Sequence, residues 1–164
     1  MMKMNRTALH ILLGICLMLF ASPSSMAQSG DMDHQHHHDA HGAATLSLDN
    51  GKKWATDEPL RQAMLGINHA AMSAVGAFHD NRLSKAEGEK LAAYIHQQVT
   101  YMVANCNLSP KADAGLHVLI GDLLQAAETL KTRPQSMEGL PRILQTLNRY
   151  ADYFDHPDWV LDHP

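Results

Sequence analysis

The residues best suited to chemistry lie between Asp31 and His41, in the segment Asp-Met-Asp-His-Gln-His-His-His-Asp-Ala-His. Imidazole and carboxylate groups are ligands for Cu(II), Zn²⁺ and Ni²⁺, and tracts this rich in histidine are typical of metal binding. A flexible segment has no fixed geometry, so we expect it to capture or buffer ions without strong selectivity. The alternative interpretation is a polar segment in which histidine is incidental. The predicted ligands are His34, His36, His37, His38 and His41.

A second candidate site combines sulfur and imidazole groups from the central part of the chain. Met102 and Cys106 are four residues apart, so on a helix both side chains project from one face. If neighbouring helices run antiparallel, Met64 and His117 fall near the height of Met102, and Cys106 lies one turn beyond. Thioether, thiolate and imidazole together favour Cu(I). The alternative is ordinary core packing of methionine and cysteine, with His117 on the flank of the bundle.

A secondary candidate site pairs His69 with His96, which fall level on adjacent predicted helices. Met72 lies one turn from His69. Two imidazoles that meet across a helix pair can bind copper, zinc or nickel. The alternative is that both rings face solvent or form hydrogen bonds with their neighbours. We therefore rank this pair below the histidine-rich segment.

The first 27 residues have the pattern of a secretory signal peptide. Lys3 and Arg6 give a positive start, residues 9–20 form an apolar run, and Ser25-Met-Ala27 is a small-x-small cleavage site. The apolar run is shorter than the ~20 residues that span a bilayer. We predict cleavage after Ala27, export to the periplasm and no membrane attachment of the mature protein.

Charge and cysteine content narrow the possible partners. Without Lys3 and Arg6, the basic residues fall from 13 to 11 against 17 acidic ones, so the formal charge becomes −6 with histidine neutral. Such a balance argues against a nucleic-acid partner. Cys106 is then the only cysteine, which excludes an intramolecular disulfide. Its thiol is expected to be buried, to crosslink a homodimer, or to bind metal.

Hydrophobic periodicity and capping signals divide the mature chain into segments. Residues 28–55 form a flexible His-rich tail and lead-in, residues 56–156 contain four amphipathic helices, and residues 157–164 form a C-terminal tail. The first helix starts at Thr56 or Asp57 and runs to about Phe78. The later start signals are the capping box of Ser84 and Glu87, the pair Ser109-Pro110, and Ser136, and His156-Pro157 ends the fourth helix.

Four such helices joined by short connections predict an all-α fold, an up-down-up-down four-helix bundle with a disordered His-rich N-terminal tail. The length of about 140 residues suffices for one domain with a real core. Neither a nucleophile–base pattern nor a paired-carboxylate motif is visible in the sequence, so we expect no enzymatic activity.

Three short segments resemble the soluble periplasmic b-type cytochromes, which are four-helix bundles that hold haem between the first and fourth helices. The segments are Leu60–Met64, Val118–Gly121 and Asn148–Ala151, within a similarity that covers residues 57–156. The resemblance implies a bundle, an exported location and Met64 as an axial ligand. The family's axial histidine aligns with Ala151, which cannot ligate iron, and the Cys-x-x-Cys-His attachment site of the c-type relatives is absent from the sequence.

These features together predict an exported, non-catalytic metal-binding protein for copper capture, buffering or resistance. Copper is favoured over zinc and nickel because of the paired sulfur residues, and haem is the least favoured cofactor. The expected partners are metal ions and a protein to which the metal is transferred. Two alternatives stay open: a haem-binding or electron-transfer bundle, and a structural or chaperone-like bundle that is indifferent to metal.

Overall fold

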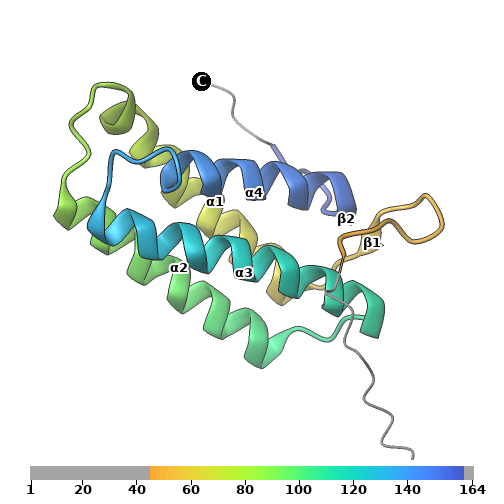
Figure 1. Cartoon of the computed structure of the whole chain (residues 1–164). Coiled ribbons are helices and arrows are strands. Elements are labelled where there is room, and N and C mark those ends of the chain that lie inside the picture. Colours follow the sequence, from red (N-terminus) through yellow and green to blue (C-terminus); the bar gives the residue numbers. More distant parts are fainter. Residues whose placement is uncertain (1–44, 161–164) are drawn as a thin grey trace, which may run out of the picture. The chain divides into compact units, whose positions relative to one another are not determined.

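The computed structural model describes residues 45–160 and shows four helices with a two-stranded sheet (Figure 1). The predicted four-helix fold is confirmed, whereas the predicted tail over residues 28–44 lies outside the described residues. None of the helices within residues 45–160 combines the length and apolarity that a membrane crossing requires. The elements are β1 (Trp54–Ala55), α1 (Glu58–His79), α2 (Lys85–Asn105), α3 (Pro110–Thr132), α4 (Leu140–Tyr153) and β2 (Phe154–Asp155).

The first three helices begin where the capping residues predict. The Asp57 carboxylate accepts a hydrogen bond from the Leu60 backbone N–H at 3.0 Å, which opens α1. Ser84 and Glu87 form the predicted capping box of α2, and hydrogen bonds from Ser84 lower the pKa of the Glu87 carboxyl. Ser109 caps α3. Each cap satisfies backbone donors that a helix start leaves without an intrahelical partner.

The fourth helix begins later than predicted, so the assignment of Ser136 as its cap is wrong. The Ser136 hydroxyl accepts from Glu138 N–H at 3.2 Å, and its carbonyl accepts from Gly139 N–H at 3.0 Å. Ser136 therefore closes a turn of its own. The helix starts at Leu140 after Gly139, which makes no side-chain cap bond. A Cβ atom on Gly139 would lie 3.2 Å from Leu130, so the chain passes close to α3 at this point.

The fourth helix also ends before the predicted His156-Pro157, because the chain becomes extended at Phe154. The short strand β2 pairs in parallel with β1, and Trp54 is aligned with Phe154. Thr56 adds a hydrogen bond from its hydroxyl to the Asp155 carbonyl at 2.6 Å. The segment before α1 is thus hydrogen-bonded to the segment that follows α4, and Trp54 is buried there.

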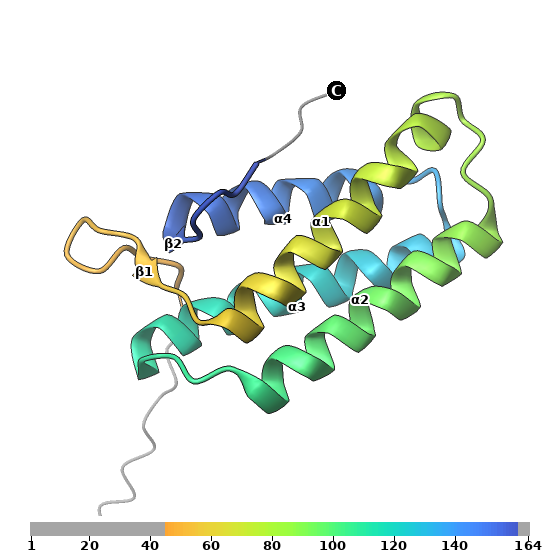
Figure 2. The same ribbon diagram turned by 180° about the vertical axis from the view of Figure 1, so that it is seen from behind.

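The core lies between the four helices, and each helix packs against the next while α4 packs against α1. Figure 1 shows α3 and α4 in front, and Figure 2 shows α1 and α2. Helices α1 and α2 come close at Gly66, where a Cβ atom would lie 2.6 Å from the Tyr94 hydroxyl. The largest fully buried side chains come from all four helices and β2: Leu60, Met64, Ile67, Ile95, Met102, Leu119, Leu123, Leu130, Leu140, Ile143, Tyr150 and Phe154.

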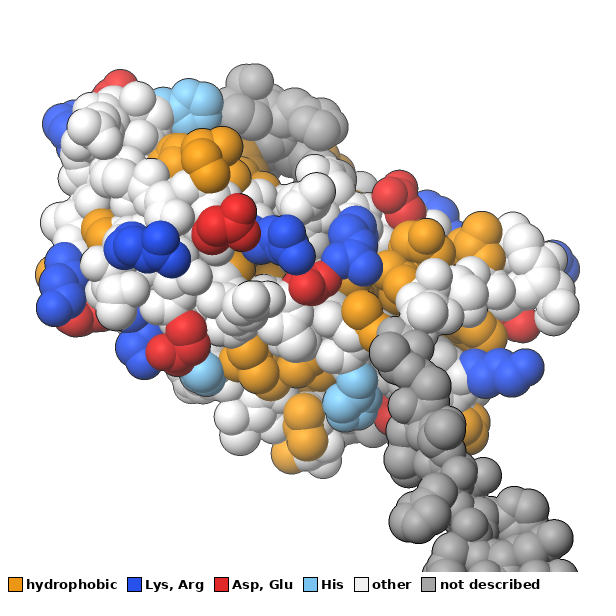
Figure 3. All heavy atoms as spheres, in the orientation of Figure 1, with side chains coloured by type: hydrophobic (Ala, Val, Ile, Leu, Met, Phe, Trp, Pro, Cys, Tyr) orange, Lys and Arg blue, Asp and Glu red, His pale blue; other side chains and the backbone are white. Residues whose placement is uncertain are grey.

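The outer surface carries charges of both signs. On the face drawn in Figure 3, acidic and basic side chains lie interspersed among apolar patches. One ion-pair cluster joins two helices, because Asp122 of α3 contacts both Arg142 and Arg149 of α4. Surface pairs of this kind add little stability individually. Packing of α3 against α4 therefore sets their side-by-side position, and the ion pairs lie over it.

Candidate metal centre

A small cavity of about 170 Å³ lies where α2 ends and α3 begins. Residues 106–109 connect these helices, so the last turn of α2 and the first turns of α3 lie side by side. We call this cavity the donor cavity, because four of its lining side chains carry groups that can bind a metal. It is lined by Met102, Val103, Cys106, Asp113, Leu116, His117 and Ile120.

The two sulfur residues reach the donor cavity from α2. Met102 is fully buried, and Cys106 is half-buried at the C-cap of the helix. The backbone N–H of Cys106 donates to the Met102 carbonyl at 2.9 Å, so the last helical turn fixes their relative position. The predicted facing of these two residues toward a common site therefore agrees with the structure.

The imidazole of His117 reaches the same cavity from α3. Its Nδ1 lies 2.9 Å from the backbone carbonyl oxygen of Asp113 and 3.5 Å from the Asp113 carboxylate. Because a carbonyl oxygen can only accept, this contact assigns the ring proton to Nδ1 and leaves the lone pair on Nε2. Metal-binding histidines usually have such a hydrogen bond on the second nitrogen. His117 is therefore held in a tautomer that offers Nε2 as a ligand.

The electrostatic surroundings of Cys106 favour a cation over a free thiolate. Burial, followed by the negative charge and hydrogen bonding of Asp57 and the charge of Asp113, raises the pKa of the Cys106 thiol to about 12. The thiol is thus protonated at neutral pH, which disfavours a nucleophilic role. A bound metal ion reverses this balance, since a cation deprotonates a coordinating thiol and is attracted by the same carboxylates.

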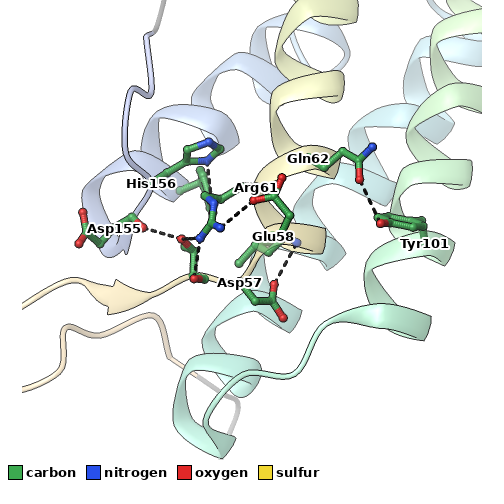
Figure 4. Close-up of polar contacts among 10 residues, drawn as sticks. Asp57, Glu58, Arg61, Gln62, Tyr101, Asp155 and His156 are labelled. Atoms are coloured by element: carbon green, nitrogen blue, oxygen red, sulfur yellow. Dashed lines mark hydrogen bonds and ion pairs between the residues drawn. The ribbon is translucent and has the colours of Figure 1, made fainter.

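Asp57 connects the donor cavity to the start of α1. One of its carboxylate oxygens caps α1 at the Leu60 N–H, and the other accepts from the Asn107 N–H at 2.6 Å. Arg61, one turn along α1, donates to the Thr56 carbonyl at 2.8 Å and to Glu58 (Figure 4). The residue after Cys106 is therefore tied to an ordered helix start.

An aromatic cluster closes the end of the bundle near β2. The Tyr150 hydroxyl lies 3.0 Å from Nδ1 of His156, and the Tyr150 and Trp159 rings are 5.0 Å apart between centroids. Burial raises the pKa of Tyr150, and burial together with Arg61 lowers the pKa of His156. Both groups are therefore neutral near pH 7. Their hydrogen bond serves packing at this end, outside the lining of the donor cavity.

The predicted participation of Met64 finds no support in the cavity lining. Met64 is fully buried on α1, whereas the donor cavity is lined by residues of α2 and α3. Conversely, Asp113 and Asp57 were not among the site residues predicted from the sequence. Asp113 is four residues before His117 on one helix, a spacing that places both side chains on one face and was visible in the sequence. The contact between Asp57 and Asn107 is long-range, so local sequence carried no signal for it.

The residues of the secondary candidate site, His69, His96 and Met72, have different surroundings. His96 lies 2.9 Å from Glu128 of α3, and hydrogen bonds from Lys131 and His96 lower the pKa of Glu128. His69 is exposed on α1. Met72 is partly buried and packs against the core. The histidine-rich ligands predicted between residues 34 and 41 lie outside the described residues.

The described residues hold no ready cluster of three strong ligands. Over residues 45–160, no three side chains among histidine, cysteine, aspartate and glutamate stand together as a metal site. The donor cavity supplies a thioether in addition, and its imidazole belongs to an exposed side chain.

A larger hollow of about 560 Å³ runs between α1 and α2. We call it the alanine groove, because small side chains of α1 form much of its wall. Its charged groups are Glu87 and Lys90, which are not ligands that soft metal ions prefer. The lining residues are Ala70, Ser73, Ala74, Ala77, Leu83, Glu87, Lys90, Leu91, Ala93, Tyr94 and Gln97.

Comparison of the chain with protein-family models, with curated proteins and with solved structures found no match. A functional proposal therefore rests on the chemistry of the donor cavity and of the sequence.

Proposed function

We propose that the protein is an exported, non-catalytic copper-binding protein that captures and buffers the ion, with a selective Cu(I) site in the donor cavity. The observation that supports this most is the common lining of one cavity by Met102, Cys106 and His117. Two sulfur ligands and one imidazole form a set that suits Cu(I). The proposed role of His34, His36, His37, His38 and His41 is weaker collection of ions before they reach this site.

The sulfur content of the cavity favours Cu(I) over Zn²⁺. Zinc sites in proteins use thiolate, imidazole and carboxylate ligands, whereas a thioether is a ligand for soft ions. Met102 is fully buried at the cavity and has no other polar function there. A zinc ion would have to use Asp113 in place of Met102. The two ions therefore share Cys106 and His117 and differ in the third ligand.

The apolar part of the lining supports the same proposal. Leu116 and Ile120 are almost fully buried beside the ligands and limit the access of water. An apolar surrounding disfavours hydrated, hard cations, which keep their water shell, and is compatible with a soft ion of low charge. Cu(I) carries one positive charge, which a single Cys106 thiolate neutralises. The filled site would then be neutral apart from Asp113.

This proposal is tested by letting the mature protein compete with a chromophoric Cu(I) chelator under reducing, anaerobic conditions. We expect two classes of site, one of which is lost when all five tail histidines are changed to Gln. The remaining class should bind one Cu(I) per chain and should disappear in Cys106→Ser. Met72→Leu is the matched control, because it removes a methionine that lies outside the donor cavity.

Two results would contradict the proposal. Absence of Cu(I) binding tighter than about micromolar in the unchanged protein would exclude it, since even a weak imidazole cluster reaches that range. Equal binding by the Cys106→Ser variant and the unchanged protein would exclude the donor cavity. Circular dichroism of each variant verifies that the helices are retained.

A further inference from the structure

We infer that Asp57 is a positioning residue for the metal site, because it holds the connection between α2 and α3 in the place where Cys106 faces the donor cavity. This inference rests on the proposed function, and it adds a residue of α1 to a site whose lining comes from α2 and α3. Asp57 does not line the donor cavity. Its proposed action is therefore exerted through Cys106.

The two carboxylate oxygens of Asp57 have separate hydrogen-bond partners. Oδ1 accepts from the Leu60 N–H at 3.0 Å, and Oδ2 accepts from the Asn107 N–H at 2.6 Å. A helix N-cap needs only the first of these bonds. The second bond is charge-assisted, which makes it the stronger type of hydrogen bond. It joins the residue after Cys106 to a helix that is distant in the sequence.

The backbone beyond Cys106 is no longer held by the hydrogen bonds of α2. The chain leaves α2 at Cys106 in an extended conformation, with φ −71° and ψ 141°. The last intrahelical bond at this position runs from the Cys106 N–H to the Met102 carbonyl. Beyond it, the direction of the chain is set by where Asn107 is held. The Asp57 carboxylate provides that support at the first residue past the helix.

Hydrogen bonds of the neighbouring residues hold Asp57 in place. Thr56 beside it donates to the Asp155 carbonyl of β2 and accepts from Arg61 through its own carbonyl. Figure 4 shows Arg61 and Asp155 with Asp57 around the start of α1. The pairing of β1 with β2 fixes the residues immediately before this point. A support that is itself fixed can restrict the position of Cys106.

Asp57→Ser separates positioning from capping. Serine is as good an N-cap as aspartate, but its single oxygen can serve the Leu60 N–H and leaves the Asn107 N–H without its acceptor. Ser84→Ala is the matched control, because it removes a helix cap at α2, away from the donor cavity. We expect Asp57→Ser to weaken Cu(I) binding by about 10- to 100-fold, as is usual for residues that orient a metal ligand. Ser84→Ala should lower stability and leave Cu(I) binding unchanged.

A second measurement that needs no metal keeps the inference testable on its own. The alkylation rate of Cys106 by iodoacetamide at pH 8 should rise several-fold more in Asp57→Ser than in Asp113→Asn, because both variants lose a carboxylate that raises the pKa of the thiol but only Asp57→Ser also releases the connection. It should stay unchanged in Ser84→Ala. A thermal unfolding curve for each variant shows whether the effect follows stability instead.

The outcomes distinguish this inference from the proposed function. Failure of the unchanged protein to bind Cu(I) removes the proposed function, whereas an alkylation rate that rises more in Asp57→Ser than in Asp113→Asn still supports positioning. Binding by the unchanged protein with equal affinity in Asp57→Ser overturns the inference alone. Equal alkylation rates in Asp57→Ser and Asp113→Asn overturn it as well. Parallel losses of Cu(I) affinity in Asp57→Ser and Ser84→Ala would show a general effect of stability and would also overturn it.

Discussion

The donor cavity and the alanine groove are both hollows between neighbouring helices, but they differ in size and in chemistry. The alanine groove has a volume of about 560 Å³ and the donor cavity about 170 Å³. The larger hollow is walled by Ala70, Ala74 and other small side chains, whereas the lining of the smaller one includes sulfur, imidazole and carboxylate groups. We therefore place the proposed metal site in the smaller hollow, because its lining carries the groups that bind metal ions.

The two hollows also arise from different causes. The alanine groove exists because small side chains of α1 face α2 beyond the close contact of Gly66 with Tyr94. It is a result of incomplete filling. The donor cavity lies where α2 ends at Asn105 and residues 106–109 lead the chain into α3. It is thus a result of the change in chain direction.

The largest effect is expected at Cys106, in the donor cavity. The pKa of its thiol, about 12, lies above that of an unfolded cysteine, so the folded protein retains the proton as pH rises through 8.5. At pH 8.5 the folded protein should react with iodoacetamide at least about 100-fold more slowly than the protein in urea. Its rate should keep rising with pH up to 9.5, whereas the rate in urea levels off. A plateau near pH 8.5 in the folded protein would contradict this.

The metal preference of the donor cavity should depend on two single residues. Met102→Leu removes the thioether but keeps the volume, so it should lower Cu(I) affinity by about tenfold and leave Zn²⁺ affinity unchanged. Asp113→Asn should lower Zn²⁺ affinity more than Cu(I) affinity, because zinc uses the carboxylate as a ligand. Competition titrations of both ions with both variants measure these changes. Equal losses for Cu(I) and Zn²⁺ in each variant would contradict the assignment of the third ligand.

Filling the alanine groove should affect stability alone. Ala74→Leu adds apolar contacts opposite Leu91 and is expected to raise the free energy of unfolding by about 0.5–2 kcal/mol. Urea denaturation measures the gain, and Cu(I) competition should give the affinity of the unchanged protein. A loss of Cu(I) affinity with intact helices would show that the alanine groove and the donor cavity are coupled. It would contradict the expectation that the groove affects stability alone.

The smallest effect is expected at His96. The imidazole is exposed and pairs with Glu128, so His96→Ala should change stability by no more than about 1 kcal/mol. The number of copper ions bound per chain should stay the same. A lower stoichiometry would instead support the secondary site that the sequence suggested for His69 and His96.

Local signals made much of the fold predictable. Asp57, the capping box of Ser84 and Glu87, and Ser109 before a proline placed three helix starts within a residue or two, because a cap and its partner are close in sequence. The pairing of β1 with β2 could not be predicted, since two-residue strands carry no periodic pattern and lie far apart in the chain. The start of α4 was missed because Ser136 uses its oxygens in a separate turn.

The candidate site was predictable to the extent that it depends on helical spacing. Met102 and Cys106 share a face by their four-residue separation, and the short connection to α3 brings His117 beside them. Spacing within one helix says little about what a side chain meets on a neighbouring helix. The contact of His96 with Glu128 of α3 and the burial of Met64 away from the cavity lining carried no local signal.

The measurement that tests the donor cavity most directly is copper K-edge X-ray absorption on residues 28–164, the proposed mature chain, with His34, His36, His37, His38 and His41 changed to Gln. After addition of one equivalent of Cu(I) and removal of unbound ion, we predict retained copper with two sulfur ligands and one imidazole nitrogen. The same variant carrying Cys106→Ser should retain no copper. A chain that retains no Cu(I), or that binds it through nitrogen and oxygen alone, would contradict a sulfur site between α2 and α3.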